Sequence, residues 1–112
     1  MRTPATHNYV LVGKEVVPED DYLKWAFWFE HHTKERQVRH TDLYGQSLVS
    51  TVFIGVSFDD PPLVFETMIF RVNDESVTTG RYATWEEAEC GHEIAAERER
   101  AYHQNHSCKR PD

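Results

Sequence analysis

Residues 48–72 read LVSTVFIGVSFDDPPLVFETMIFRV, and they predict the centre of a β-sheet. The two halves of this stretch, 48–58 and 63–72, are rich in β-branched and aromatic residues, a composition that predicts β-strands. The DDPP segment at 59–62 predicts a break between them, because proline cannot donate to a strand ladder. Two strands this close in the sequence favour an antiparallel pair, since a parallel pair needs a long crossover connection.

The flanking segments predict further strands of the same meander. Residues 36–44 alternate in character and predict an exposed strand, and residues 76–83 predict a weaker one. A short β-rich run at 9–12 stops at Gly13, and residues 14–17 extend it if the chain bends there. Short turns between successive strands indicate a meander rather than parallel strands joined by helices.

Two helices are also predicted. Pro18 suits the first turn of a helix over 18–32, and the acidic residues that follow it complement the positive end of the helix dipole. Aromatic and aliphatic residues cover a wide arc of this helix, so it is either deeply covered or uses part of its aromatic surface for a partner. The second helix, 84–102, begins with a capping box in which the Thr84 hydroxyl and the Glu87 carboxylate satisfy free backbone amides.

The order of these elements, β-α-β-β-β-β-α, predicts an α+β fold: a four-to-five-stranded antiparallel sheet with two helices. The chain has 112 residues, of which 39% are hydrophobic, and this size fits one core. We therefore expect a single domain at 9–102, between a flexible leader at 1–8 and a flexible tail at 103–112.

Composition narrows the classes of function. Lys and Arg number 12 against 19 Asp and Glu, and the net charge of −7 gives no general attraction to nucleic acid or anionic lipid. No apolar run approaches the ~18 residues of a membrane helix, and the first residues lack the apolar core of a secretion signal. The two cysteines, Cys90 and Cys108, indicate no disulfide framework. The sequence thus predicts a cytoplasmic protein that neither binds nucleic acid directly nor enters a membrane.

Four motifs follow one another between residues 8 and 96: WFE at 28–30, VSTVFIG at 49–55, FETMIF at 65–70, and RYATWEEAECGH at 81–92. In this order they resemble a family of small proteins of bacteriophages, prophages and metagenomes. The resemblance implies a phage-type context and a place in the host cell cytoplasm. It carries over no catalytic residue, because the loop after the glycine strand reads VSFDD at 56–60, without the His of the Asp-His pair typical of that family.

Glu66 is the most informative single position. It lies within the strand at 63–72, and both faces of that strand are largely apolar, so the carboxylate is expected to be partly covered. A covered carboxylate must be paired, hydrogen-bonded or protonated, and Arg81 on the following strand is the expected partner across a hairpin. The pair is either structural or part of a pocket, in which Glu66 acts as a general base or contacts a ligand.

Glutamates recur along one side of the second helix and form an acidic ridge of Glu86, Glu89, Glu93 and Glu97. We expect the ridge to be exposed, because the side that carries Ala88, Gly91 and Ala95 is the one that can approach the sheet. Like charges so spaced repel one another mildly, and the sequence offers them little relief. The ridge is either an ordinary solvated face or a surface for a basic partner.

Metal and nucleophilic chemistry receive little support. His103, His106 and Cys108 lie in the expected tail, whereas a zinc site needs a rigid tetrahedral set of ligands. Cys90 lies in the middle of a helix, away from the helix N-terminus that activates a thiol. His92 lies in line with small residues and is expected to be packed and hydrogen-bonded. We therefore expect no metal and no cofactor.

Three functions remain open. The first is a non-enzymatic accessory protein that binds a host or bacterial-defence protein, as a counter-defence or host-takeover inhibitor, or that forms a homo-oligomer. The second is a small-ligand binder, such as a sponge for a nucleotide signal. The third is a small enzyme that uses Glu66 with His40 or His92. Candidate contacts, besides Glu66 and the acidic ridge, are the aromatic residues and cations Trp25, Trp28, Arg39, Arg81, Tyr82 and Trp85.

Overall fold

The computed structural model describes residues 7–72 and 76–108. In chain order, these residues form β1 (Tyr9–Val12), β2 (Glu15–Pro18), α1 (Tyr22–His31), β3 (Gln37–Leu43), β4 (Ser47–Phe53), β5 (Phe65–Arg71), β6 (Val77–Tyr82) and α2 (Trp85–Cys108). The fold is α+β with the predicted order of elements, in which a hairpin of β1 and β2 takes the place of the first predicted strand.

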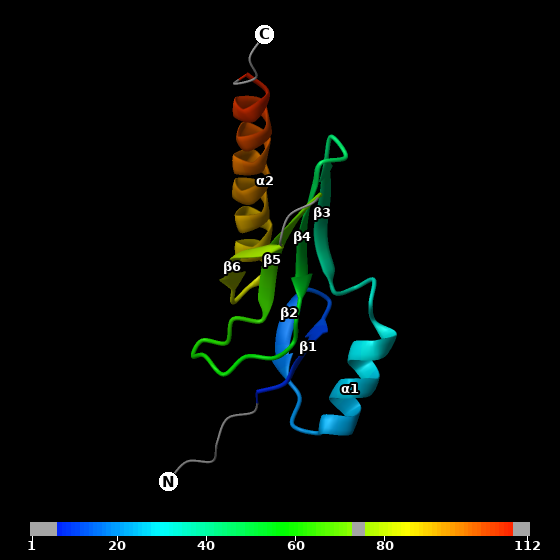
Figure 1. The fold of residues 1–112 in the computed structure, drawn as a ribbon. Coiled ribbons are helices and arrows are strands. Elements are labelled where there is room, and N and C mark those ends of the chain that lie inside the picture. Colours follow the sequence, from blue (N-terminus) through cyan, green and yellow to red (C-terminus); the bar gives the residue numbers. More distant parts are fainter. Residues whose placement is uncertain (1–6, 73–75, 109–112) are drawn as a thin grey trace.

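The strands are divided between two antiparallel sheets (Figure 1). β3, β4, β5 and β6 form the predicted meander as a four-stranded sheet, whereas β1 and β2 form a separate two-stranded sheet. β4 ends at Phe53, earlier than predicted, because Gly55 adopts a φ of +72° and turns the chain towards the hairpin. There the Gly55 carbonyl accepts a hydrogen bond from the Tyr9 amide at 2.8 Å.

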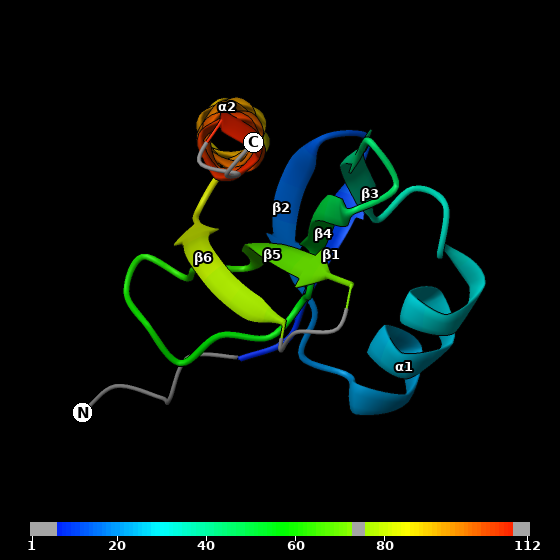
Figure 2. The ribbon, with the colours of Figure 1, turned by 45° about the horizontal axis from the view of Figure 1, so that its top comes forward.

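Helix α2 covers one face of the four-stranded sheet (Figure 2). Alternate residues of β4 and β5 point towards it, and their buried side chains are Val49, Thr51, Phe53, Phe65, Thr67 and Ile69. The helix contributes the buried alanines Ala88, Ala95 and Ala96, whose small side chains let its backbone approach the sheet. The hydrophobic core therefore lies between α2 and the sheet, and it extends to Tyr9 and Leu11 of the hairpin.

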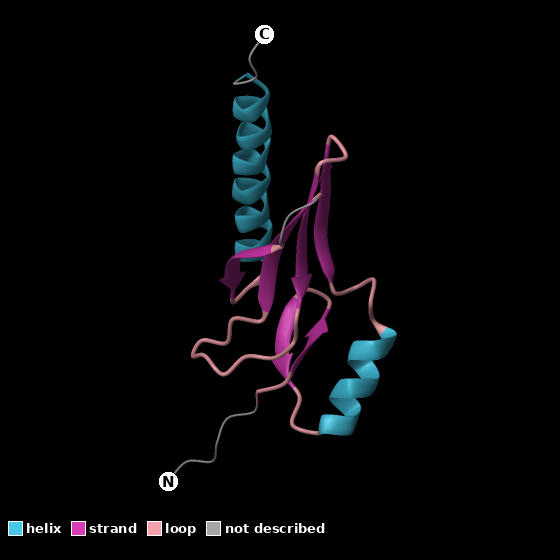
Figure 3. Ribbon diagram, viewed as in Figure 1, coloured by secondary structure: helices cyan, strands magenta, loops and turns pink. Residues whose placement is uncertain are grey.

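Helix α1 lies beside the hairpin and away from α2 (Figure 3). It begins at Tyr22, four residues later than predicted, because the Asp21 side chain caps it by accepting hydrogen bonds from the amides of Leu23 and Lys24. Pro18 was expected in the first helical turn but ends β2, where it pairs with Tyr9. The last position of a short strand tolerates a residue without an N–H.

The capping box of α2 is confirmed. The Thr84 hydroxyl accepts a hydrogen bond from the Glu87 amide at 3.1 Å, and the Glu87 carboxylate accepts one from the Ala83 amide at 3.2 Å. The helix continues to Cys108, six residues beyond its predicted end at 102. Its last turns are held because the His103 ring packs on the sheet and contacts the Ser47 hydroxyl at 2.9 Å.

The predicted leader lies partly outside the described residues, which begin at His7. Two of its residues are described: the His7 ring lies edge-on to Phe58 at 4.1 Å, and Asn8 forms a β-bridge with Val56. Residues 109–112 of the predicted tail also lie outside the described part. No helix within the described ranges has the length and apolar character that crossing a membrane requires.

Candidate functional site

Glu66 and Arg81 face each other across β5 and β6, on the side of the sheet that α2 leaves open. Arg81 Nε lies 3.2 Å from Glu66 Oε2, and the Thr78 hydroxyl donates to the same oxygen at 3.3 Å. The Glu66 side chain is only 14% exposed, so its carboxylate is largely covered and is paired, as predicted. The ion pair expected from the strand alternation is confirmed.

The predicted catalytic pairings of Glu66 are not assembled. His92 belongs to α2 and lies on the opposite face of the sheet from Glu66. His40 lies on β3, and β4 separates it from β5 by two strand spacings, about 10 Å. Within the described ranges, the hydrogen bonds of the Glu66 carboxylate go to Thr78 and Arg81. An acid–base pair of Glu66 with either histidine is therefore not supported.

His92 is packed and hydrogen-bonded, as predicted. It is fully buried, with Nδ1 at 2.7 Å from the Thr51 hydroxyl and Nε2 at 2.8 Å from the Thr41 hydroxyl. Thr51 is in turn hydrogen-bonded to Thr67 on β5. Burial lowers the pKa of His92 below its ordinary value, so the neutral ring is favoured. This chain of side chains joins α2 to three strands of the sheet.

A second buried polar group, Glu99, lies two turns further along α2. Its carboxylate accepts hydrogen bonds from Arg71 Nε at 2.8 Å and Arg71 Nη2 at 2.9 Å, and His103 Nε2 lies 3.3 Å from it. The hydrogen bonds from Arg71 hold the pKa of Glu99 below its ordinary value against the opposing effect of burial. The sequence contained a signal for this group, because Glu99 and His103 continue the stripe of Ala88, His92 and Ala95.

The acidic ridge is less free than the sequence suggested. Glu86, Glu93 and Glu97 are exposed as expected, but Glu89 is half-buried. Arg39 reaches across from β3, pairs with Glu93, and lies 3.8 Å from Glu89, so the expectation that these charges are poorly relieved is wrong. Glu97 pairs with Arg100 at 3.2 Å on the same helix. The ridge is therefore partly neutralised by the chain itself.

Helix α1 has two different sides. Trp25 and Trp28, predicted as partner contacts, are half-buried and attach the helix to the rest of the chain. Tyr22, Leu23 and Phe27 are instead the exposed apolar residues of this helix. The sequence identified α1 as an aromatic surface but did not show which of its residues are free. That distinction depends on where the hairpin lies.

The residues predicted as alternative contacts for a nucleotide lie at different places in the fold. Trp25 packs beside the hairpin, Trp85 packs against the core, and Tyr82 lies between β6 and α2, so these rings do not line one cavity. Arg39 and Arg81, the predicted phosphate contacts, are both engaged with carboxylates. Tyr82 lines a cleft on the described surface, and its cationic neighbour there is Arg98.

Metal ligands do not gather in the described part of the chain, where no group of three His, Cys, Asp or Glu side chains is placed to hold an ion. Cys90 is a free, exposed thiol. Comparison with protein-family models, curated proteins and solved structures gave no match.

Proposed function

We propose that this chain is a non-enzymatic binding protein that recognises a protein partner through helix α1. The observation that carries the proposal is the exposure of Leu23 and Phe27, at 76% and 65%, on a helix with no fully buried residue. The two residues lie four positions apart, so they are neighbours on one stripe of the helix. This stripe is here called the α1 docking face. A contiguous exposed apolar surface of this kind is typical of an interface.

The opposite side of α1 holds the docking face in place. Trp25 Nε1 donates a hydrogen bond to the Tyr9 carbonyl at 2.9 Å, and the Trp28 ring lies edge-on to Phe53 at 5.9 Å. Asp21 caps the first turn. The docking face therefore belongs to an ordered helix, and binding through it loses less conformational entropy than folding a loose segment would.

The partner is expected to offer an apolar groove, because an amphipathic helix binds by laying its apolar side into such a groove. Basic residues beside that groove would complement Glu19 and Asp20 before α1 and the net charge of −7. The motif resemblance to phage proteins makes a bacterial host or defence protein in the host cytoplasm the expected partner. The use of Glu66 in an ion pair with Arg81 supports a binding role over a catalytic one.

The test compares the double variant Leu23→Glu/Phe27→Glu with the control Val72→Glu. Val72 is also an exposed apolar residue, but it follows the far end of β5. Each protein is immobilised, bacterial lysate is passed over it, and every captured protein is purified and titrated individually. The proposal expects a partner that binds wild type and Val72→Glu alike and binds the double variant at least about tenfold more weakly. Equal affinities for all three proteins would refute it. So would light scattering that shows wild type as a dimer and the double variant as a monomer, because a second copy of the chain would then cover α1.

A further inference from the structure

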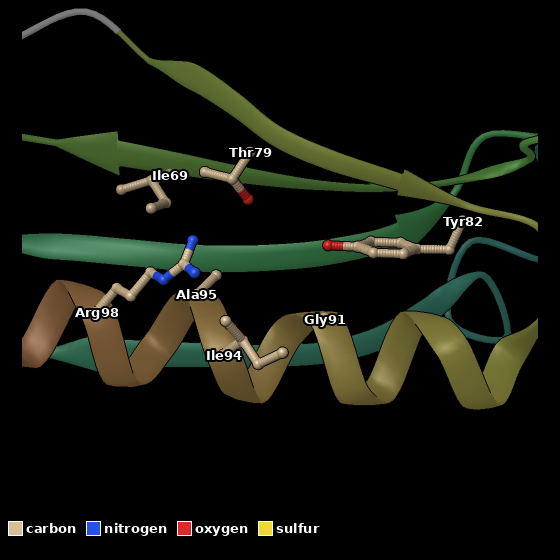
Figure 4. A pocket seen from close by; sticks show the side chains of 7 residues that line it. All are labelled: Ile69, Thr79, Tyr82, Gly91, Ile94, Ala95 and Arg98. Carbon is tan, nitrogen blue, oxygen red and sulfur yellow. The ribbon is translucent and has the colours of Figure 1, made fainter.

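A cleft between β6 and α2 combines an apolar floor with a cation, Arg98 (Figure 4). It has a volume of about 300 Å³, within the lower range of small-molecule sites. Ile69 and Ala95 are its buried residues, and Ile94 forms an exposed apolar wall. Thr79, Tyr82 and Arg98 contribute the polar side chains.

Two glycines seat the Tyr82 ring at one end of the cleft. A β-carbon built on Gly91 of α2 or on Gly80 of β6 would overlap the hydroxyl end of that ring. Neither glycine has a positive φ, so the space taken by the ring, and not the backbone conformation, requires glycine at both positions. The Tyr82 hydroxyl is thus held in a fixed place, without a hydrogen-bond partner among the described residues.

Arg98 is unusual among the arginines of the described residues. Arg39, Arg71, Arg81 and Arg100 each pair with a carboxylate, and Arg36 lies over the Phe29 ring and donates to the Phe29 carbonyl. Within the same described part, Arg98 has no ion pair, hydrogen bond or ring contact. A free guanidinium beside an apolar floor, in a protein of net charge −7, is a binding group for an anion.

The glutamates of the acidic ridge do not pair with the Arg98 guanidinium. The ridge lies on the β3 side of α2, where Arg39 reaches it, whereas Arg98 lies on the β6 side with Gly91 and Ile94. Figure 4 shows the Tyr82 hydroxyl and the Arg98 guanidinium pointing towards the same space from opposite ends, with the Thr79 side chain between them. The cleft is therefore locally cationic although the chain is acidic.

We propose that this β6–α2 cleft binds a small organic monocarboxylate with an apolar body. The carboxylate pairs with the Arg98 guanidinium and accepts a hydrogen bond from the Tyr82 hydroxyl, while the apolar body lies on Ile69, Ile94 and Ala95. A single cation in an acidic protein favours a monoanion over a phosphate dianion, since the second charge would meet no counter-charge. The proposal is independent of α1, which lies elsewhere on the molecule.

The experiment is an NMR titration of the full chain, labelled with ¹⁵N, with 3-phenylpropionate as the probe. Its neutral amide and inorganic phosphate are titrated in parallel. We expect saturable shifts confined to residues around the cleft, with a Kd of about 1 mM or tighter, as a ligand of this size allows. The amide and phosphate are expected to bind at least about tenfold more weakly.

Three variants test the contacts. Arg98→Gln should weaken binding about tenfold, because it removes the positive charge that pairs with the carboxylate. Tyr82→Phe should weaken it about threefold, because it removes the hydroxyl that donates a hydrogen bond. Arg100→Gln removes the same charge from the same helix outside the cleft and should change the Kd by less than about twofold. Arg98→Lys, which keeps the charge, should bind between wild type and Arg98→Gln. Unchanged spectra elsewhere confirm the fold of each variant.

Three results would overturn the proposal: no saturable shifts at about 10 mM probe, equal binding of the amide, or an equal loss of affinity in Arg98→Gln and Arg100→Gln. The Leu23→Glu/Phe27→Glu variant should bind the probe as wild type does. Its behaviour separates a failure of the cleft from a failure of the α1 docking face.

Discussion

The Arg71 guanidinium donates two hydrogen bonds to the Glu99 carboxylate, from Nε to Oε2 at 2.8 Å and from Nη2 to Oε1 at 2.9 Å. Glu99 is 2% exposed and Arg71 is 26% exposed, so the pair is largely shielded from water. The Tyr102 ring lies against the other side of Arg71, at 4.0 Å from the guanidinium carbon. This arrangement ties the end of β5 to the later turns of α2.

Glu99→Gln should destabilise the fold by about 3 kcal/mol, because it leaves the Arg71 cation without its counter-charge in a largely buried place. The measurement is urea unfolding at neutral pH. Glu97→Gln, which breaks an exposed pair with Arg100 on the same helix, is the matched control and should change stability by less than about 1 kcal/mol. Equal effects of the two changes would show that burial of the Glu99 pair does not matter.

Acid should weaken the fold in two separate windows, the first of which belongs to His92. Its pKa is lowered by burial from the ordinary 6.5, so the unfolded chain binds the proton more readily than the folded chain. The stability that the neutral ring contributes is complete above pH 6.5 and declines as the pH falls from there towards the lowered pKa. His92→Gln should flatten this slope in unfolding experiments between about pH 7 and pH 5. If stability fell with pH as steeply in His92→Gln as in wild type, His92 would not be the group that titrates in this window.

The second window belongs to Glu99, whose pKa is lowered from the ordinary 4.5 chiefly by its hydrogen bonds with Arg71. Its contribution is complete above pH 4.5 and is lost as the pH falls through the lowered pKa, because the folded state then loses the ion pair. The Glu99→Gln variant should therefore lack this part of the acid transition. If the stability of Glu99→Gln fell with pH below 4.5 as steeply as that of wild type, the Glu99–Arg71 ion pair would not be the cause of this part of the acid transition.

Gly91→Ala should destabilise the fold by about 1–2 kcal/mol, although alanine normally strengthens a helix by about 1 kcal/mol. The reason is the overlap between the added methyl group and the Tyr82 ring. In a Tyr82→Ala background the same change should be neutral or stabilising, so a double-mutant cycle in urea isolates the contact. If Gly91→Ala stabilised the wild type, the ring would not be seated as described.

Arg39→Gln should lower stability by less than about 1 kcal/mol, because its contacts with Glu89 and Glu93 lie on the surface. The loss should shrink as salt is raised from 0.05 to about 1 M, since exposed charges are screened. Thermal unfolding at the two salt concentrations measures both effects. A loss that does not respond to salt would indicate that packing of the Arg39 side chain, rather than its charge, stabilises the contact.

Local patterns predicted much of the fold. The alternation in β4 and β5, the capping box at Thr84 and Glu87, and the Glu66–Arg81 pair all depend on residues close in sequence or paired across one hairpin. The start of α1 was misplaced because Pro18 and Asp21 are both good helix-start residues. Pairing of Pro18 with Tyr9 in the hairpin decides between them, and the helix sequence does not encode that pairing.

Other features depended on contacts between distant elements. The end of α2 was set too early because Glu99 and His103 look like solvated residues until Arg71 and Ser47 are placed beside them. Arg98 gave no signal at all, since its importance comes from the position of β6. Likewise, the sequence marked α1 as aromatic but could not separate its attached side from its exposed side.

Photo-crosslinking tests most directly whether the α1 docking face meets another protein. A photoreactive phenylalanine analogue is placed at Phe27, and in a separate protein at the equally exposed control position Val72. After irradiation in bacterial cytoplasm, we expect a discrete crosslinked species at position 27 that contains a different protein, and no such species at position 72. No crosslink at position 27, the same products from both positions, or a crosslink only to a second copy of this chain would contradict it.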